Sequence, residues 1–369
     1  MYIKPVAQKS ELTQFISFPY HLHRRTQNWI APLRLDQKNI FNPAKNSALQ
    51  HCDYQLFLLY QNHEIIGRIA VSINHIANDY WKQSIGLFGH YECIDHPEAS
   101  SLLLGAAETW LKERGMTIMR GQWNFVSQDI GLVLEGFDVP PIVLSSHNPP
   151  YYNDQMTHFG MKKAKDLFVY ACDISKGYEM PERFLSYTDK IAERYRVTVR
   201  AIDMNNLVND ARIILRLTNA AIGGNWGYYP VEESEAEQIA ADLKQVIHPE
   251  VVLIAEIDGE PIGYLLAVPD VNAILKNMNG RLFPFGIFKL MRGLKKLRRY
   301  RIWALGLLEP YQKKGISVLM FRRLNDILSP KKAYVEANWV LEDNALMNNA
   351  LKQLRFDLVK KYRIYEKEI

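Results

Sequence analysis

The chain has 369 residues, of which 48% are hydrophobic and 23% charged, and a net charge of +5. This composition is typical of a globular protein with two domains of ordinary size, and the charge is too small to indicate nucleic-acid binding by itself. Cys52, Cys93 and Cys172 form no CxxC pair, which argues against a disulfide framework or a cysteine zinc site and favours a reducing cytoplasm. We expect neither a signal peptide nor a membrane-spanning helix, because no run approaches the ~18 apolar residues that a span needs.

The first half begins with an aromatic, loop-like segment and then predicts a β-hairpin. Two strand-like runs, Gln55–Tyr60 and Glu64–Ile73, flank a short polar turn. Pro97–Arg114 has helical periodicity and ends before a glycine, as a capped helix does. Further strands are predicted at Ser84–Ile94, Met116–Val126 and Asp166–Ile174, with a short helix at Asn153–Phe159.

The second half repeats this alternation of strands and helices. A connecting loop and helix at Ile174–Tyr195 place the domain boundary near residue 178, which gives domains at 1–178 and 179–369. A second hairpin is predicted at Val251–Val268, with Asp258 and Gly259 at its turn. The other predicted strands are Arg196–Ile202, Arg301–Leu308, Lys332–Val340, Phe356–Tyr362 and Arg363–Lys367, and the helices are Asn205–Ala220, Glu232–Ile247, Gly315–Leu328 and Asn344–Leu354. The pattern predicts two mixed α/β domains with related layouts.

One motif joins a buried strand to a helix through a basic turn, in the sequence LLEPYQKKGISVLM from Leu307 to Met320. The first turn of a helix has unpaired N–H groups and a partial positive charge, so it suits a phosphate or pyrophosphate. Gly315 allows close approach of the backbone, and Lys313 and Lys314 add charge. A solvated lysine turn before a helix explains the same residues, and both interpretations remain open at this point.

The six residues from Gln312 to Ser317 resemble the Q/R-x-x-G-x-G/A signature of the GCN5-related N-acetyltransferases (GNATs). The segment Asn344–Phe356 resembles a later motif of that family, and the order of elements from Arg196 onward resembles its layout. The resemblance implies an α/β fold with a mixed sheet in each of two tandem GNAT-like domains. It also implies that coenzyme A contacts Leu307, Leu308, Gln312, Lys313, Lys314, Gly315, Ile316, Ser317 and Asn344.

The sequence departs from the family pattern at several positions. Ser317 and Arg355 replace small residues, and Leu351 stands where many members carry the tyrosine that protonates the leaving thiolate. The first domain has the acidic sequence DHPEASS where the coenzyme A loop would lie. Carboxylates there repel a pyrophosphate, so we expect the first domain to be degenerate for coenzyme A.

We predict Glu336 as the general base, because it alternates with Tyr334 and Asn338 on one face of a strand. A structural glutamate paired with a lysine or arginine is an equal alternative. The resemblance implies that the strand Trp303–Leu308 supplies an N–H to the thioester carbonyl, with a bulge that Gly306 permits; an ordinary buried strand is the alternative. Tyr365, and less so Tyr362, are candidates for the missing acid, and Glu342 and Asp343 are predicted to cap a helix.

The loop GGNWGYYP lies where the family forms the acceptor pocket, so Asn225, Trp226 and Tyr228 are predicted acceptor contacts. A loop packed by its own aromatic residues is the alternative. His21 and His23 form an H-x-H without companions, and we predict surface or loop histidines and no metal. All three cysteines lie in the first half, so we expect direct transfer in a ternary complex.

An insertion at about 271–301 is basic and amphipathic. No Asp or Glu occurs from Val271 to Leu308, whereas nine Lys and Arg do. The apolar positions at helical spacing are Ile287, Leu290, Met291, Leu294 and Leu297, preceded or joined by Phe283, Phe285 and Phe288. The basic positions assigned to the opposite face are Lys289, Arg292, Lys295, Lys296 and Arg299. A helix packed on the first domain, a membrane-interface helix and a nucleic-acid contact all remain open.

Together these features predict an N-acyltransferase that moves an acyl group from acyl-CoA or acetyl-CoA to an amine. The whole chain also resembles tandem bacterial acetyltransferase-like proteins, some of which are implicated in acylating sphingoid bases, so a lipid amine is the implied acceptor. We expect a cytoplasmic protein, peripheral at the inner membrane face, with an anionic membrane surface rather than nucleic acid as partner. The alternatives are an inactive GNAT-fold binding protein and a FemAB-like aminoacyl transferase.

Overall fold

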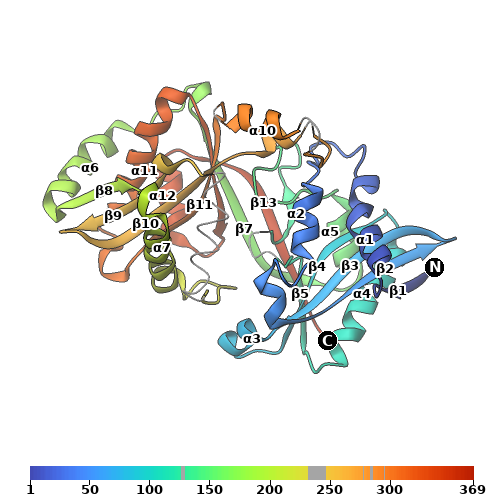
Figure 1. Ribbon diagram of the computed structural model, residues 1–369. Coiled ribbons are helices and arrows are strands. Elements are labelled where there is room, and N and C mark those ends of the chain that lie inside the picture. The colour runs from blue at the N-terminus through green and yellow to red at the C-terminus, as the bar shows by residue number, and fades with distance from the viewer. Residues whose placement is uncertain (126–128, 232–246, 277, 283–285, 295) are drawn as a thin grey trace. The chain divides into compact units, whose positions relative to one another are not determined.

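The computed structural model of the chain describes residues 1–125, 129–231, 247–276, 278–282, 286–294 and 296–369 (Figure 1). Its helices are α1 (Lys9–Leu22), α2 (Arg34–Ile40), α3 (His75–Trp81), α4 (Pro97–Lys112), α5 (Tyr151–His158), α6 (Glu182–Tyr195), α7 (Leu207–Ile222), α9 (Asn272–Leu275), α10 (Gly286–Leu294), α11 (Ile316–Leu328) and α12 (Ala345–Gln353). Its strands are β1 (Tyr2–Pro5), β2 (Cys52–Gln61), β3 (Glu64–Asn74), β4 (Ile85–Cys93), β5 (Ile118–Gly121), β6 (Leu132–Glu135), β7 (Lys162–Asp173), β8 (Val197–Ala201), β9 (Val252–Ile257), β10 (Glu260–Pro269), β11 (Arg299–Leu307), β12 (Tyr334–Leu341) and β13 (Asp357–Glu368). Across these ranges, no helix combines the length and the apolar character that crossing a membrane requires.

The chain divides into two compact units, and neither is continuous in sequence. Unit 1 comprises Met1–Leu167, Asn272–Leu290 and Lys360–Ile369. Unit 2 comprises Phe168–Val271 and Met291–Val359. This division differs from the predicted domains at 1–178 and 179–369, since Asn272–Leu290 of the insertion and Lys360–Ile369 at the end of the chain belong to unit 1.

Two long strands, β7 and β13, each pass from one unit into the other (Figure 1). The first part of β7 belongs to unit 1 and its second part to unit 2, whereas β13 runs from unit 2 into unit 1. In unit 1, β13 pairs antiparallel with β5, so Tyr365 lies opposite Gly121. In unit 2, β7 neighbours β12. A strand from the other half of the sequence therefore completes each sheet.

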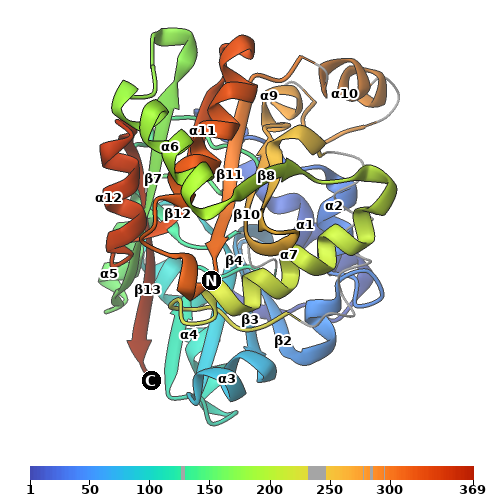
Figure 2. The ribbon, with the colours of Figure 1, turned by 90° about the vertical axis from the view of Figure 1, so that its left-hand side faces the viewer.

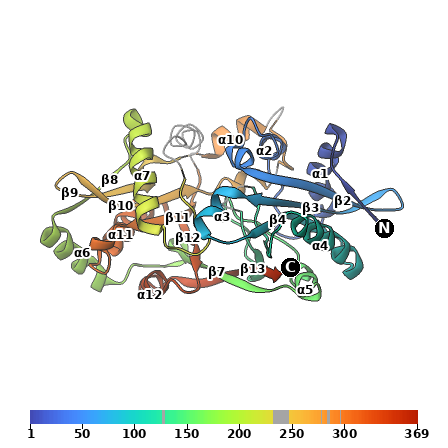
Figure 3. The same ribbon diagram turned by 90° about the horizontal axis from the view of Figure 1, so that it is seen from below.

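Unit 1 is a mixed sheet in the order β1-β2-β3-β4-β5-β13. Its neighbouring strands run antiparallel, except for the parallel pair β4 and β5. Helix α4 buries Leu103, Leu104 and Ala107 against one face, and α1 packs Phe15 and Ile16 on the other (Figure 3). The predicted α/β fold is thus confirmed for this unit.

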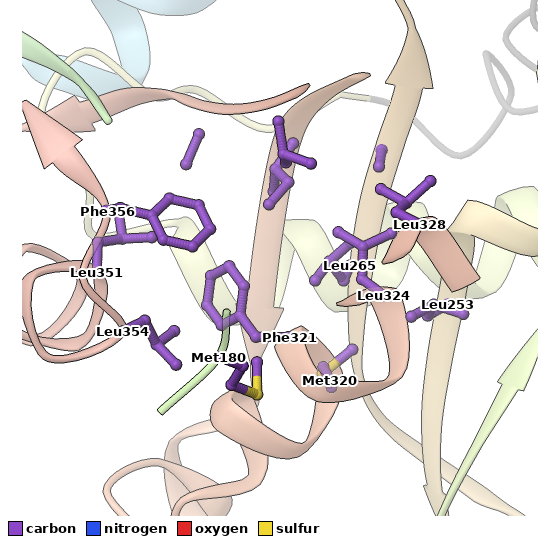
Figure 4. Packing of buried hydrophobic residues seen from close by; sticks show 14 of the residues in the cluster. Met180, Leu253, Leu265, Met320, Phe321, Leu324, Leu328, Leu351, Leu354 and Phe356 are labelled. Carbon is purple, nitrogen blue, oxygen red and sulfur yellow. The ribbon is translucent and has the colours of Figure 1, made fainter. Parts of the chain in front are cut away.

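Unit 2 has the strand order β7-β12-β11-β10-β9-β8 and the same mixture of directions. Strands β8 to β11 are antiparallel, and β11 and β12 are parallel. Helices α6, α11 and α12 lie on one face and α7 on the other (Figures 2 and 3). The larger core, in Figure 4, packs Met180, Leu253, Leu265, Met320, Phe321, Leu324, Leu328, Leu351, Leu354 and Phe356. Leu351, at the position of the missing tyrosine, is therefore a core residue.

The predicted elements with the strongest local patterns are confirmed. Both hairpins form, and Asp258 and Gly259 adopt the positive φ angles, 52° and 85°, that their turn requires. The loop predicted near the N-terminus is wrong, because α1 continues through Pro19. Glu11 stabilises its start by accepting the N–H groups of Ala7 and Gln8, at 2.8 and 3.0 Å. The helix predicted at 232–247 lies outside the described residues except for its last residue.

Candidate active site

Strands β11 and β12 separate at their carboxyl ends. Their last parallel pair is Ile302 with Ala337, after which β11 continues to Leu307 and β12 to Leu341 without pairing to each other. Backbone groups on the inner sides of the two strands thus lack ladder partners beyond this point. A ligand that carries amides and a carbonyl can use such groups, as an added strand does.

The bulge in β11 lies at Trp303. The register with β10 shifts between Leu266 and Ala267, which leaves Trp303 without an opposite residue. The prediction of a bulge at Gly306 is wrong, since Gly306 pairs regularly with Tyr264. A Cβ on Gly306 would come within 2.6 Å of the Tyr264 ring, so glycine is needed there for this packing.

The loop after β11 presents a run of free N–H groups. It passes through a short 3-10 turn at Glu309–Tyr311 and reaches α11 at Gly315, its N-cap, with φ of 82°. Among the described residues, the backbone N–H groups of Lys313, Lys314, Gly315, Ile316 and Ser317 donate no hydrogen bond. Free donors at and just before a helix N-terminus are groups that can bind an anion.

Two side chains brace this loop. Gln312 donates from its Nε2 to the Leu307 carbonyl at 3.0 Å, so this predicted coenzyme A contact holds the loop together. The Lys314 ammonium lies 5.5 Å from the ring centres of Tyr195 and Tyr311, whereas Lys313 is exposed. Both lysines therefore add positive charge to the loop, Lys314 beside two aromatic rings and Lys313 in solvent.

Helix α6 lies against the loop, a contact that we did not predict from the sequence. A Cβ on Gly315 would meet Ile191 Cδ1 at 2.3 Å and Tyr187 Cε1 at 2.9 Å. Tyr187, Ile191 and Tyr195 recur every four residues along α6, and that periodicity was the only sequence signal for this face. Gly315 is thus fixed both by its left-handed backbone and by its neighbours.

A buried polar cluster lies where β11 and β12 begin to separate. The Glu336 carboxylate accepts the Tyr334 hydroxyl at 2.9 Å, an Arg299 nitrogen at 3.4 Å and the Asn338 amide at 3.4 Å. Burial, followed by the charge of Glu336, raises the pKa of Tyr334, which keeps that hydroxyl a donor. The predicted shared face is confirmed, and the ion pair with an arginine, the structural alternative for Glu336, is present.

The sequence did not indicate the role of Arg301 in this cluster. Arg301 is fully buried, donates from Nε to the Asn338 carbonyl at 3.3 Å and lies over the Trp339 ring at 4.8 Å. The side-chain oxygen of Asn338 is buried and has no hydrogen-bond partner in the described part of the chain. This buried oxygen is thus an acceptor that remains available for a hydrogen bond.

The predicted acceptor loop follows α7, on the same face of the sheet as Glu336 by strand alternation. Asn219 on α7 holds it in place, donating to the Val231 carbonyl at 3.0 Å and accepting the Tyr228 hydroxyl. Trp226 is half-buried and Asn225 is exposed. The loop is therefore ordered partly by its own aromatic residues, with Asn225 at its surface.

Two other predicted site residues have structural partners. Asn344 is the N-cap of α12 and accepts the Met347 N–H at 3.1 Å, so the capping role predicted for Glu342 and Asp343 is wrong. Tyr365 lies in unit 1, where its hydroxyl donates to Asn153 at 2.9 Å. The structure thus assigns Tyr365 and Glu336 to different units.

In unit 1 the corresponding separation of β4 and β5 is filled by the chain itself. Their last pair is Phe88 with Gly121, and the Trp123 N–H then donates to the Phe88 carbonyl at 2.8 Å. The His90 N–H is taken by the Asn124 side chain at 2.5 Å. The backbone groups freed in unit 2 are therefore occupied here.

Of the two histidines, His21 is exposed, whereas His23 lies in the turn that ends α1 and is buried, with its Nε2 2.5 Å from Glu92. Burial raises the pKa of Glu92, but His23, Arg68 and Tyr152 together outweigh it and leave that pKa lowered. Within the residues described, no group of three or more His, Cys, Asp or Glu side chains is arranged to hold a metal ion.

No protein-family model matches the chain. It is 31% identical over 380 residues to "Protein YghO" of Escherichia coli (strain K12), covering 100% of this chain and 95% of that protein. It is 32% identical over 381 residues to "Bacterial ceramide synthase" of Caulobacter vibrioides, covering 99% and 97%.

Solved structures share its fold. A tandem GNAT protein from the clavulanic acid biosynthesis pathway matches with a TM-score of 0.56 at 11% identity, covering 100% of this chain and 98% of that one. A GCN5-related N-acetyltransferase from Sphaerobacter thermophilus matches with a TM-score of 0.51 at 13% identity, covering 85% and 80%. The predicted tandem GNAT fold is confirmed.

Proposed function

The chain belongs to the family of Protein YghO and the bacterial ceramide synthase and has a tandem GNAT fold, and we propose that it transfers an acyl group from acyl-coenzyme A to an amine nitrogen. The observation that carries the proposal is the loop of unit 2, with free N–H groups from Lys313 to Ser317 beside two lysines. Such a loop suits the pyrophosphate of coenzyme A. The blocked strand separation in unit 1 supports a single donor site, in unit 2.

In this proposal the thioester enters between β11 and β12, and a free N–H near the bulge at Trp303 polarises its carbonyl. Glu336 and the Asn338 side-chain oxygen accept the N–H groups of the amine. Glu336 takes the proton as nitrogen bonds to the acyl carbon and the carbon–sulfur bond breaks. The thiolate is a stable leaving group, since thiols have a pKa of about 8.5, so Leu351 at the tyrosine position is tolerable.

The acceptor we propose is a long-chain amine of the sphingoid type, with a long-chain acyl-CoA as donor. A ceramide is an amide of a fatty acid and a sphingoid base, and the relative named as a ceramide synthase matches along nearly the whole chain. Such an amine resides in a bilayer. We therefore place the protein in the cytoplasm, as a peripheral protein at the inner face of the membrane.

Calorimetry and product analysis test this function together. The protein is titrated with coenzyme A, acetyl-CoA and palmitoyl-CoA, and then incubated with each donor and either sphinganine or a short soluble amine. We expect binding of the thioesters and an amide product by mass spectrometry. Binding without any amide would instead indicate an inactive GNAT-fold binding protein. No binding of any thioester would overturn the proposal in favour of a FemAB-like enzyme.

Replacing the proposed base should slow the reaction with little effect on folding. We expect Glu336→Gln to lower kcat by about a hundredfold or more, because glutamine accepts no proton yet retains the hydrogen bond from Tyr334. The matched control is Glu250→Gln, in which a half-exposed glutamate paired with Lys331 in the same unit is changed identically. Equal kcat for both variants would identify Glu336 as a structural ion-pair residue only.

A further inference from the structure

Helix α10 carries large apolar side chains that the protein leaves in solvent. Phe288 and Met291 are 65% and 64% exposed, and Ile287 is 38% exposed. They lie at positions i, i+1 and i+4, so they share one side of the helix. An amphipathic helix in a soluble domain normally buries such a side. The predicted alternative of a helix whose apolar face packs on the first domain therefore fails for Phe288 and Met291.

A different side of α10 contacts the protein. Gly286 is buried, and Leu290 and Leu294 are half-buried, which accounts for the packing of the helix. The chain leading to α10 is anchored in unit 1, where the Arg34 N–H donates to the Gly280 carbonyl at 3.0 Å. The exposed apolar side thus follows a segment that is fixed to unit 1 at Gly280.

Exposed Lys and Arg side chains lie next to the apolar side of α10, both on the helix and in the chain before and after it. Lys289, Arg292 and Lys296 are exposed, and so are Lys276, Arg281 and Arg298. No carboxylate occurs anywhere in the sequence from 271 to 308. Arg299, predicted for this face, instead begins β11 and pairs with Asp270 and Glu336, while Lys295, Phe283 and Phe285 lie outside the described residues.

These properties together select one kind of partner. Aromatic and sulfur-containing side chains flanked by cations, without any acid, match the interface of an anionic bilayer, where apolar groups enter the acyl boundary and cations meet phosphates. Nucleic acid would use the cations but leave Phe288 and Met291 exposed.

We propose that the exposed side of α10 docks the protein on anionic membranes, with Phe288 and Met291 inserted and Lys289, Arg292 and Lys296 at the headgroups. This inference rests on the proposed function in that it names the surface from which a lipid acceptor reaches the enzyme. The exposed residues of α10 also support the inference independently of that function.

Flotation with vesicles tests the surface. Vesicles of phosphatidylglycerol and phosphatidylethanolamine are compared with vesicles of phosphatidylcholine, at low and at high salt. We expect the wild type to float with the anionic vesicles and to be released by salt. The double variant Phe288→Ser/Met291→Ser, and the triple variant with Gln at Lys289, Arg292 and Lys296, should each bind about tenfold more weakly or worse.

The control removes two apolar side chains of similar exposure elsewhere, Leu35 in α2 (55%) and Leu346 in α12 (52%), by Leu35→Ser/Leu346→Ser. It should float like the wild type. Wild type that stays unbound by anionic vesicles at low salt, or a Phe288→Ser/Met291→Ser variant that floats normally, overturns the inference, as does equal binding to neutral vesicles. Binding of a DNA duplex with the same salt dependence but no vesicle binding would assign the cations to nucleic acid.

A second measurement separates this inference from the proposed function. Acyl transfer to a short soluble amine is measured without vesicles, where the wild type and both α10 variants should have equal rates. Acyl transfer without flotation would support the proposed enzyme activity and contradict the docking surface. Flotation without acyl transfer would support the docking surface and contradict the enzyme activity.

Discussion

Gly315→Asp should weaken coenzyme A binding by about a hundredfold or more, roughly 3 kcal/mol. The substitution brings a carboxylate to the place where five free N–H groups attract an anion. It also puts a side chain where Ile191 and Tyr187 already lie, on a backbone with φ of 82°. Calorimetric titration with coenzyme A measures the loss, and thermal unfolding of the same samples reports any strain in α11.

Since Gly315→Asp can also distort the loop, Lys313→Glu provides a second measurement. Lys313 is exposed, so its change replaces a cation with an anion without disturbing packing, and we expect roughly tenfold weaker binding. Lys332→Glu is its control, because Lys332 is also an exposed lysine of unit 2 with a positive φ, 47° against 58°. If Lys313→Glu and Lys332→Glu bind coenzyme A as the wild type does while Gly315→Asp unfolds, the loop is not the pyrophosphate site.

The loop was predictable because its signals are local. A proline ends the strand, a lysine pair and a glycine follow, and an apolar helical pattern begins at once. Gly315 does adopt the left-handed conformation that favours glycine. The same holds for the hairpin at Asp258 and Gly259. Such features depend on neighbouring residues only, so a single sequence contains them.

The environment of Glu336 was only half predictable. Alternation along one strand correctly put Tyr334, Glu336 and Asn338 on a common face. The contact with Arg299 depends on the register between β11 and β12, which are joined by a helix, and no local pattern specifies that register. The bulge illustrates the same limit, because the extra residue is set by pairing with β10 and falls at Trp303 rather than at the glycine.

The sequence could not predict that the last strand completes the sheet of unit 1, since this pairing joins residues that lie far apart in the sequence. Arg120 donates to Glu366 at 2.7 Å and Arg363 to Asp166 at 2.8 Å, yet each is an ordinary charged residue on a strand. The sequence therefore suggested that residues 1–178 form a complete domain. If residues 1–178 formed a complete domain, that domain would fold without the end of the chain. In the structure, the end of the chain is part of unit 1.

Deleting Lys360–Ile369 should prevent unit 1 from folding. The deletion removes the strand that pairs with β5, and with it Tyr362, Ile364 and Tyr365, each at most 3% exposed. Burial of three such side chains contributes roughly 5–9 kcal/mol, about the whole stability of an ordinary domain. Hydrogen exchange should show fast exchange throughout β2, β3 and α4 in the shortened chain.

Single substitutions on the same strand separate this effect from a general sensitivity of the C-terminus. Ile364→Ser, at a fully buried position in unit 1, should cost about 3 kcal/mol or more, whereas Leu358→Ser, at a position that is 44% exposed, should cost under about 1 kcal/mol. A fragment of residues 1–178 should be unfolded alone and gain structure when a peptide of residues 357–369 is added, because the peptide supplies the strand beside β5. A fragment that folds cooperatively without the peptide would show that the first half forms its own domain, and that β13 only adds to a sheet already complete.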